Sequence, residues 1–305
     1  MSATDFAGDP PLFIARLIAD PASLEASLDA ATRALEGEGM PLAVAQMLDS
    51  CGDVLQLMLP HGERATLLRI LDEHFHPSDL MVSEADFPRP DVFVSDMDST
   101  IIGQECIDEL ADYAGIKPQI AAITERAMLG ELDFEAALRQ RVGLLAGLEE
   151  SAIGQCLDER IRPMAGARML VATLKSQGCK TVLVTGGFHH FADPVAELVG
   201  FERVIANRLA VHEGRLTGGL VGAITGSSAK EAALRDEAAR YGDDAVTLAT
   251  GDGANDIAML RSATYGVAFR AKPRARAAGN GWIDRGDLTA ILKLLDIPEH
   301  DWVAG

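Results

Sequence analysis

Basic side chains are scarce in this sequence of 305 residues. It contains 27 Lys and Arg against 46 Asp and Glu, which gives a formal net charge of −19 at pH 7. Such a charge repels both the phosphate backbone of nucleic acids and the anionic surface of membranes. We therefore expect neither a nucleic-acid partner nor a membrane partner.

Long apolar runs and closely spaced cysteines are missing as well. No uninterrupted apolar stretch approaches the roughly 18 residues that a membrane-spanning helix needs. The first residues, MSATDFAGDPP, have neither the basic nor the apolar region of a secretory signal. The four cysteines show no CxxC spacing, so the sequence predicts neither a zinc site nor a disulfide framework. We expect a cytoplasmic protein.

Lysine is absent from residues 1–90, and this absence marks a change in composition along the chain. These residues hold 15 acidic and 5 basic side chains, a balance of −10, whereas the remaining residues carry −9. The segment Phe87-Pro88-Arg89-Pro90, which disfavours regular structure, ends this acidic part. The sequence therefore predicts an N-terminal domain over residues 1–88 and a larger domain over residues 89–305.

The N-terminal part predicts an α+β fold. Its apolar patterns indicate strands near 12–19, 42–48, 54–59 and 80–82, and helices over 24–35 and 65–75. The order β-α-β-β-α-β is typical of the ferredoxin-like fold.

The larger part predicts an α/β fold. Short strands that are apolar on both faces are expected at 92–95, 181–185, 246–250 and 265–269. Such strands fit a Rossmann-like, doubly wound parallel sheet, whose ligands bind at the carboxyl ends of the strands. The helix-rich residues from about 104 to 160 are too many for a loop and predict a helical cap inserted after the first strand. Residues 204–224 predict a small hairpin.

Acidic residues follow two of these strands. Asp96 and Asp98 come directly after the first, and Asp252 and Asp256 follow the third. Single aspartates after strands are usually turn or helix caps, and that interpretation also fits Asn255 and Asp256. The alternative is that Asp96, Asp252 and Asp256 surround one hard cation such as Mg²⁺, which prefers oxygen ligands.

Two further segments suit an anionic ligand. Thr185-Gly186-Gly187 follows the second strand and lets backbone N–H groups approach an anion, although a plain tight turn also explains the glycines. Ser228-Ala229-Lys230-Glu231 fits a capping box with Ser228 as N-cap, which places Lys230 in the first turn of a helix. The helix dipole disfavours a cation there unless a substrate phosphate binds at the same end.

These four motifs together resemble those of the haloacid dehalogenase superfamily. The nucleophile motif is DMDST, the hydroxyl motif TGGF, the lysine motif SAK and the acidic motif GDGAND, in the order that the superfamily uses. The resemblance implies the superfamily fold and a dependence on Mg²⁺, with metal ligands drawn from Asp96, Asp98, Asp252 and Asp256.

The expected chemistry begins with neutralising a phosphate monoester, which otherwise repels an attacking anion, by Mg²⁺ and Lys230. Asp96 then attacks phosphorus in line and forms an aspartyl phosphate. Asp98 protonates the departing alkoxide and later takes a proton from the attacking water. Thr185 completes the expected catalytic set.

Residues of the predicted cap indicate the substrate. Helical spacing places Phe134 and Arg141 on one side, where Arg141 is either a snorkelling side chain or a bidentate clamp for a carboxylate. Glu105 lies at the junction nearest Asp96, although a solvated acidic face is the default interpretation. An ammonium at Glu105 and a carboxylate at Arg141 describe a phosphorylated amino acid.

Within the superfamily, the sequence resembles the phosphoserine phosphatase family through the spacing from Asp96 to Glu105 and through MLGELDFEAALRQRV and TGGF. The resemblance implies a set of substrate-binding residues: Glu105, Met128, Phe134, Arg141, Thr185, Gly186, Lys230 and Asn255. Two positions depart from the family pattern. Thr185 stands where Ser is usual, and Gly103-Gln104 precedes Glu105 where the family often has Asn.

The expected function is Mg²⁺-dependent hydrolysis of O-phospho-L-serine to L-serine and phosphate, the last step of serine biosynthesis. One alternative is a phosphatase or phosphotransferase for phosphohomoserine or phosphoethanolamine, and another is a serine-sensing protein with a vestigial catalytic half. The N-terminal domain is similar in element order to ACT-like regulatory domains, which implies serine binding there. Its simpler interpretation is a domain that forms a homodimer contact or serves solubility.

Overall fold

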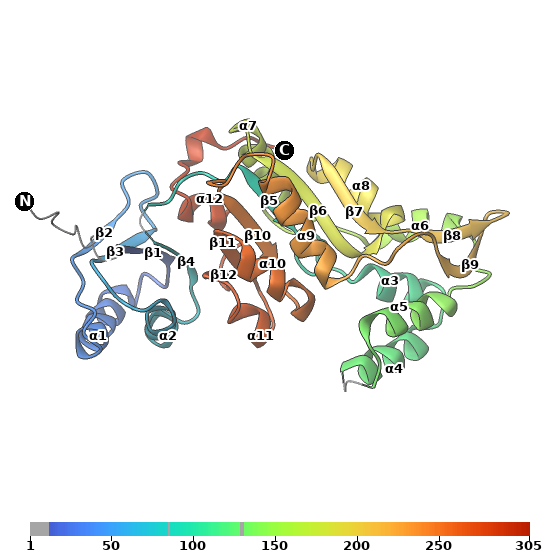
Figure 1. The fold of residues 1–305 in the computed structure, drawn as a ribbon, viewed down its shortest axis with the longest axis horizontal. Helices are drawn as coiled ribbons and strands as arrows, with labels where there is room; N and C mark the ends of the chain where they lie inside the picture. Colours follow the sequence, from blue (N-terminus) through green and yellow to red (C-terminus); the bar gives the residue numbers. More distant parts are fainter. Residues whose placement is uncertain (1–11, 85, 129–130) are drawn as a thin grey trace, which may run out of the picture.

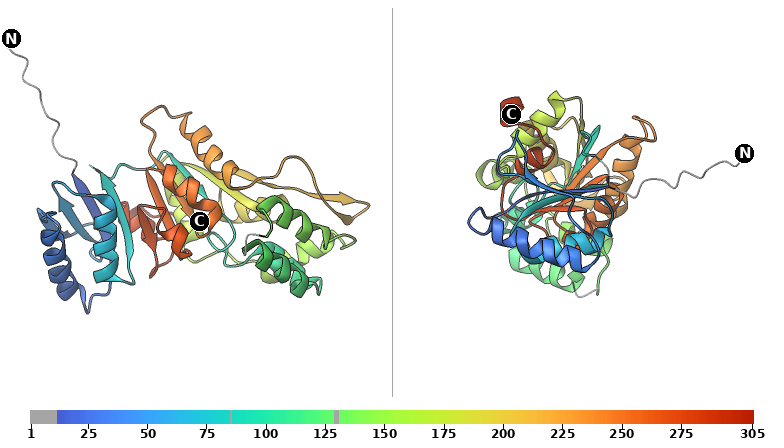
Figure 2. Two further views of the ribbon diagram at one scale, coloured as in Figure 1. Left: turned by 60° about the horizontal axis from the view of Figure 1, so that its bottom comes forward. Right: turned by 90° about the vertical axis from the view of Figure 1, so that its left-hand side faces the viewer.

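The computed structural model describes residues 12–84, 86–128 and 131–305, which form a mixed α/β fold around one long sheet. The sheet has ten strands in the order β2-β3-β1-β4-β12-β11-β10-β5-β6-β7. Figures 1 and 2 show its N-terminal strands at one end of the molecule and a group of cap helices at the other.

The N-terminal unit, residues 12–84, confirms the predicted order of elements. It comprises β1 (Phe13–Ile18), α1 (Leu24–Gly37), β2 (Val44–Met47), β3 (Leu55–Leu59), α2 (Arg64–Phe75) and β4 (Asp79–Glu84). Each strand is antiparallel to its neighbours in this unit. Both helices lie on one face of the sheet (Figure 1), as the predicted β-α-β-β-α-β chain requires.

The remaining strands form the predicted parallel sheet. They are β5 (Val92–Ser95), β6 (Lys180–Phe188), β7 (Arg203–Asn207), β10 (Thr247–Gly251), β11 (Tyr265–Phe269) and β12 (Gly281–Ile283). All neighbouring pairs among these six run parallel. The Rossmann-like sheet is therefore confirmed.

Helices cover both faces of this parallel sheet. One face packs α7 (Ala167–Ser176), α8 (His189–Val199) and α12 (Ala290–Leu294), and the other packs α9 (Ser227–Ala238), α10 (Ile257–Ser262) and α11 (Pro273–Arg276). Successive strand residues alternate between these faces, so Phe93 joins the first apolar cluster while Val92 and Val94 join the second. The second cluster also contains residues of α1 and α2.

The predicted hairpin over residues 204–224 was wrong at its start. Residues 203–207 are instead β7, which pairs in parallel with β6 as the edge strand of the main sheet. The hairpin consists of β8 (Leu209–His212) and β9 (Arg215–Leu220), and it packs against the cap helix α5. The apolar residues Val204 and Ile205 lie against the sheet core, which is why this segment does not belong to the hairpin.

The insertion after β5 is the predicted helical cap, and its described residues form four helices where two or three were expected. These are α3 (Cys106–Tyr113), α4 (Lys117–Met128), α5 (Phe134–Gly143) and α6 (Ser151–Arg160). Two chain segments connect the cap to the sheet, and an isolated bridge between Ile102 and Pro163 joins them. No helix of the described residues is both long and apolar enough to span a bilayer.

The N-terminal unit and the parallel sheet meet where β4 pairs antiparallel with β12. The sheet is therefore continuous across the segment that separates β4 from β5. The domain boundary after residue 88 stays a prediction.

Candidate active site

Asp96 follows the last residue of β5 and is held in place by its neighbours. Its backbone N–H donates to Thr250 O at 3.0 Å, and its Oδ1 accepts from the Met97 N–H at 2.8 Å. The side chain is buried, and burial raises its pKa well above the usual range, although the Lys230 ammonium opposes this shift. Asp96 thus stands at the carboxyl edge of the sheet, where the sequence predicts it.

Three carboxylates gather at this edge. Asp96, Asp252 and Asp256 each offer an oxygen within 4.8 Å of the others. Asp256 Oδ2 accepts from the Gly253 N–H at 3.0 Å, and a Cβ at Gly251 would collide with the Asp256 carboxylate. This close approach explains the glycine at 251, while a Cβ at Gly253 would collide with the Asn255 side chain. Oxygen donors gathered this tightly fit a hard divalent cation such as Mg²⁺.

Burial acts on Asp252 as well, and it raises the pKa of this carboxyl to about 6. Asp256 adds to the shift through like-charge repulsion, while Lys272 opposes it. Asp98, the fourth metal ligand that the sequence predicts, does not belong to the carboxylate cluster found among the described residues. Its role as a ligand stays a prediction.

Lys230 lies between two of the three carboxylates. Its Nζ is 2.7 Å from Asp96 Oδ1 and 2.6 Å from Asp256 Oδ1, and its side chain is 1% exposed. Burial alone would lower the pKa of Lys230, but the two carboxylates outweigh burial and raise it. Lys230 therefore carries its charge in the core of the site.

The predicted capping box before Lys230 was wrong. Helix α9 begins at Ser227 with Gly226 as N-cap, and no side chain caps it. Glu231 instead accepts a hydrogen bond from the Ser262 hydroxyl and pairs with Arg235. Lys230 is nevertheless the fourth residue of the helix, at the end of its first turn, because the helix starts two residues earlier than predicted.

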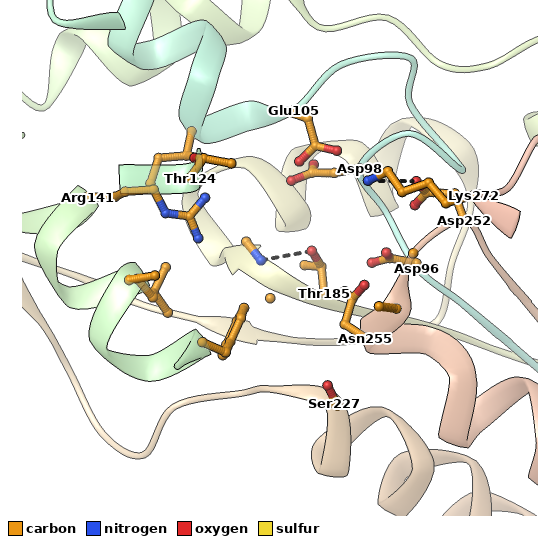
Figure 3. Close-up of a pocket in the computed structure, with 18 of the residues that line it drawn as sticks. Asp96, Asp98, Glu105, Thr124, Arg141, Thr185, Ser227, Asp252, Asn255 and Lys272 are labelled. Atoms are coloured by element: carbon orange, nitrogen blue, oxygen red, sulfur yellow. Dashed lines mark hydrogen bonds and ion pairs between the residues drawn. The ribbon is translucent and has the colours of Figure 1, made fainter. Parts of the chain in front are cut away.

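Asp98 lies on the cap side of Asp96, beside Glu105 (Figure 3). Its Oδ1 is shielded from solvent and has no hydrogen-bond partner in the described part of the chain. Burial, reinforced by repulsion from Glu105, raises the pKa of Asp98 to about 7. A carboxyl with this pKa can both donate and accept a proton near neutral pH.

The TGGF segment is the last part of β6, where the pairing with β7 shifts register between Val184 and Phe188. The Thr185 hydroxyl oxygen accepts from the Gly187 N–H at 2.9 Å, and a Cβ at Gly187 would press on that hydroxyl and on Asp98. The glycines thus permit a close approach of backbone to the reacting groups. Thr185 supplies the hydroxyl that the family pattern places there as Ser.

Asn207 supports this end of β6 and was not identified from the sequence. Its Nδ2 donates to Gly186 O at 2.8 Å and to Thr225 O at 3.1 Å, while its Oδ1 accepts from the Thr225 N–H at 2.8 Å. It thereby ties the TGGF segment to the segment before α9. A polar residue at the end of an apolar strand could have marked Asn207 as a candidate site residue, but β7 itself was not predicted.

A cavity of about 670 Å³ opens between the sheet edge and the cap. The predicted residues that line it are Asp96, Asp98, Glu105, Phe134, Arg141, Thr185, Gly186, Asp252 and Asn255. Thr124, Ser227, Lys272 and Arg274 also line it and were not predicted. Met128 ends α4, and its side chain lies outside the described residues.

Arg141 and Glu105 reach into this cavity from the cap (Figure 3). Arg141 Nε is buried and has no hydrogen-bond partner among the described residues, and burial lowers the pKa of its guanidinium. Glu105 Oε1 accepts from the Ser99 hydroxyl at 2.8 Å. Phe134 lies against Gly186 and Gly226, so it bridges the cap and the sheet edge.

The departure at Gln104 has a structural role. Its Oε1 accepts from the Arg162 N–H at 2.9 Å, and the Gly103 N–H donates to Arg162 O at 3.3 Å. Gln104 therefore joins the two chain segments that connect the cap to the sheet.

Comparisons with known proteins agree with this geometry. The haloacid dehalogenase-like hydrolase family matches residues 93–261. Phosphoserine phosphatase of Haemophilus influenzae is 40% identical over 225 residues, which cover 72% of this chain and 71% of that protein.

Solved structures extend the match. A haloacid dehalogenase family hydrolase of Salmonella enterica serovar Typhi superposes with a TM-score of 0.79 and 29% identity, over 93% of this chain and 98% of the other. A phospho-aspartyl intermediate analogue of phosphoserine phosphatase superposes with a TM-score of 0.61 and 37% identity, over 68% and 99%. The chain belongs to the haloacid dehalogenase-like hydrolase family, in the group whose curated members are phosphoserine phosphatases.

Proposed function

We propose that the protein is a Mg²⁺-dependent phosphoserine phosphatase, which hydrolyses O-phospho-L-serine to L-serine and phosphate as the last step of serine biosynthesis. One observation carries this proposal. A single cavity brings Asp96, which is paired with the buried Lys230, together with the Glu105 carboxylate and with Arg141, whose Nε has no hydrogen-bond partner among the described residues. These groups complement the phosphate, the ammonium and the carboxylate of phosphoserine.

The first half of the proposed reaction transfers the phosphoryl group to the protein. Asp96, Asp252 and Asp256 would hold Mg²⁺, which when bound neutralises charge on the phosphoryl oxygens. An Asp96 carboxylate oxygen attacks phosphorus, and the bond from phosphorus to the serine oxygen breaks. Asp98 gives its proton to that oxygen, so serine leaves as the alcohol. The solved phospho-aspartyl analogue of a relative supports such an intermediate.

The second half returns the protein to its starting state. Asp98, now a carboxylate, takes a proton from a water molecule that attacks phosphorus. The bond between phosphorus and Asp96 breaks, and phosphate leaves. A pKa of Asp98 of about 7 suits both directions of proton transfer at neutral pH. Lys230 balances the charge of the Asp96 carboxylate before the attack, and that of the phosphoryl group while Asp96 carries it.

The proposed substrate contacts divide between the sheet edge and the cap. The phosphate contacts at the carboxyl edge of the sheet are Thr185, Gly186 and Asn255, which line the cavity. Lys230, which lies beside Asp96, is the fourth. Glu105 binds the ammonium, and Arg141 binds the carboxylate through its two-pronged guanidinium. Phe134 covers the substrate where it bridges the cap and the sheet. Met128 is the remaining proposed substrate contact, and the family resemblance supports it.

We further propose a separate N-terminal domain that binds serine or forms a homodimer contact. Its support is the similarity of its element order to small amino-acid-binding domains. The proposed location is the cytoplasm, whose reducing conditions suit the four free cysteines.

A phosphate-release screen over phosphoserine, phosphohomoserine and phosphoethanolamine, with and without Mg²⁺, tests the proposal. We expect phosphoserine to give the highest kcat/KM, and only with Mg²⁺. Asp96→Asn should abolish release, while the exposed cap variant Asp158→Asn serves as a matched control and should retain it. Turnover of another ester without turnover of phosphoserine would reject the substrate, and an active Asp96→Asn would reject the covalent mechanism.

A further inference from the structure

The short helix α11 lies between the active site and the N-terminal unit. At its start, the Lys272 N–H donates to Asp252 O at 3.0 Å, and Lys272 Nζ lies 4.0 Å from Asp252 Oδ2. Lys272 and Arg274 both line the cavity. Figure 3 shows the Lys272 side chain reaching Asp252 at the edge of the site. Helix α11 therefore brings two cations to the mouth of the cavity.

The other end of α11 is tied to the N-terminal unit by Arg276. Its guanidinium donates to both carboxylate oxygens of Asp72 on α2, at 3.0 and 2.6 Å. Its Nε donates to Asp284 at 2.9 Å, and its Cζ lies 3.9 Å from the centre of the Trp282 ring. A planar guanidinium held by two carboxylates and one aromatic face has little freedom to move.

The N-terminal unit also holds the loop that carries Asp284. Asp79, the first residue of β4, is buried and accepts from the N–H groups of Asp284, Arg285 and Gly286 at 2.8 to 3.2 Å. The pairing of β4 with β12 continues this connection through the backbone. Both carboxylate partners of Arg276 are therefore fixed by the N-terminal unit.

The charges of α11 matter because the protein carries −19 while its proposed substrate is an anion. The summed field of the protein disfavours the approach of such a substrate. Lys272 and Arg274 are exposed, and no ion pair of Arg274 occurs in residues 12–84, 86–128 and 131–305. The two cations at the mouth offset part of the negative charge of the carboxylates that line the same cavity.

We propose that Arg276 is a positioning residue through which the N-terminal unit holds Lys272 and Arg274 at the mouth of the active site, where they attract the anionic substrate. The inference rests on the proposed function only in requiring a phosphate monoester as substrate. It assigns to the N-terminal unit an effect on substrate association that needs no bound effector.

The test compares Arg276→Lys and Asp72→Asn with the wild-type full chain. Each variant should raise KM about threefold to tenfold and leave kcat within about twofold, because a charge at the rim acts on association. Arg274→Gln should also raise KM. Because this variant lacks one of the two cations that attract the substrate, its KM should change less with ionic strength than the wild-type KM does. Asp72→Asn leaves the packing of Arg276 on Trp282 in place. It therefore still tests the proposal if the Arg276→Lys protein folds poorly.

Asp53→Asn is the matched control, because it breaks the ion pair of Asp53 with Lys293 between the same two parts of the chain, far from α11. It should lower Tm without changing KM. If Asp72→Asn and Arg276→Lys lower Tm as this control does and leave KM unchanged, Arg276 is only structural and the inference fails. Failure of the proposed function would appear instead in the wild type, as absent turnover of phosphoserine. The ratio of KM between each variant and the wild type can then be measured with whichever monoester is hydrolysed. The inhibition constant of inorganic phosphate gives the same comparison.

Discussion

Lys230 Nζ lies 2.7 Å from Asp96 Oδ1, and both side chains are almost fully buried. A buried ion pair gains little net stability when intact, because both charges lose water, but a remaining unpaired charge is costly. Lys230 also contacts Asp256, so one ammonium balances two of the three clustered carboxylates. The stability of the metal-free site and its chemistry therefore depend on the same side chain.

Replacing this lysine should separate the two roles. We expect Lys230→Met to lower the free energy of unfolding by about 3–5 kcal/mol without Mg²⁺, since two buried carboxylates lose their partner. Mg²⁺ should restore part of this loss, while phosphate release stays at least about 100-fold below wild type. Urea unfolding with and without Mg²⁺ measures the first effect. Lys272→Met, at an exposed lysine, is the control and should leave stability nearly unchanged. A Lys230→Met protein as stable as the wild type without Mg²⁺ would contradict the charge argument.

The pKa of Asp98 predicts a pH dependence for the first half of the reaction. Below about pH 7 the carboxyl holds the proton that the serine oxygen needs, and above it the proton is lost. The rate of serine release in a single turnover should therefore fall as pH rises through about 7. Rapid quenching of serine release between pH 5.5 and pH 9 measures it, with Asp98→Asn expected to be inactive across this range.

p-Nitrophenyl phosphate provides the control for this prediction, because its leaving group departs without a proton. Asp98→Asn should release one nitrophenolate per protein rapidly and then stall, since the water attack lacks its base. Steady turnover of this substrate by Asp98→Asn would assign the base to another residue.

Arg141 should determine the preference for a substrate carboxylate. We expect Arg141→Ala to lower kcat/KM for phosphoserine by about 10- to 100-fold, which corresponds to about 1.5–3 kcal/mol for a charged hydrogen bond. Phosphoethanolamine, which lacks the carboxylate, should be nearly unaffected. Arg139→Ala on the same helix removes only an exposed pair with Glu135 and should change neither substrate. Equal losses with both substrates would show that Arg141 does not read the carboxylate.

Asn207 should link the position of the TGGF segment to phosphate binding. Asn207→Ala leaves the buried carbonyl groups of Gly186 and Thr225 without a donor, and we expect a loss of about 1–3 kcal/mol in stability together with weaker inhibition by phosphate. Asn280 is a matched control, because it makes the same kind of contacts to Val82, Thr264 and Gly266 away from the cavity. Asn280→Ala should lose stability but keep its phosphate inhibition constant. Equal phosphate inhibition in the two variants would remove Asn207 from the binding machinery.

The catalytic and metal-binding residues could be predicted where they come directly after strands that are apolar on both faces. The segment 92–95 reads as a buried strand in isolation, so Asp96 is placed by the residues immediately before it. The same reasoning places Thr185 and Asp252, because β6 and β10 have the same character. Local pattern was sufficient in these places because burial on both faces leaves a continuous apolar run.

Strands that are very short or that carry polar residues could not be predicted in this way. Strand β12 has only three residues, and its pairing with β4 depends on a contact between distant parts of the chain. Strand β7 contains Arg203 and Asn207, so its sequence resembles a surface hairpin until β6 pairs with it. Asn207 and Arg276 were missed for the same reason, since their partners lie far away in sequence.

The pairing of β4 with β12 also sets a condition on synthesis of the chain. Strand β4 leaves the ribosome long before residues 281–283, and at about 5–20 residues per second the delay is on the order of ten to forty seconds. During this time its backbone N–H and C=O groups on that side have no strand to pair with. A nascent chain in this state is open to pairing with another copy, and translation of β12 ends the exposure.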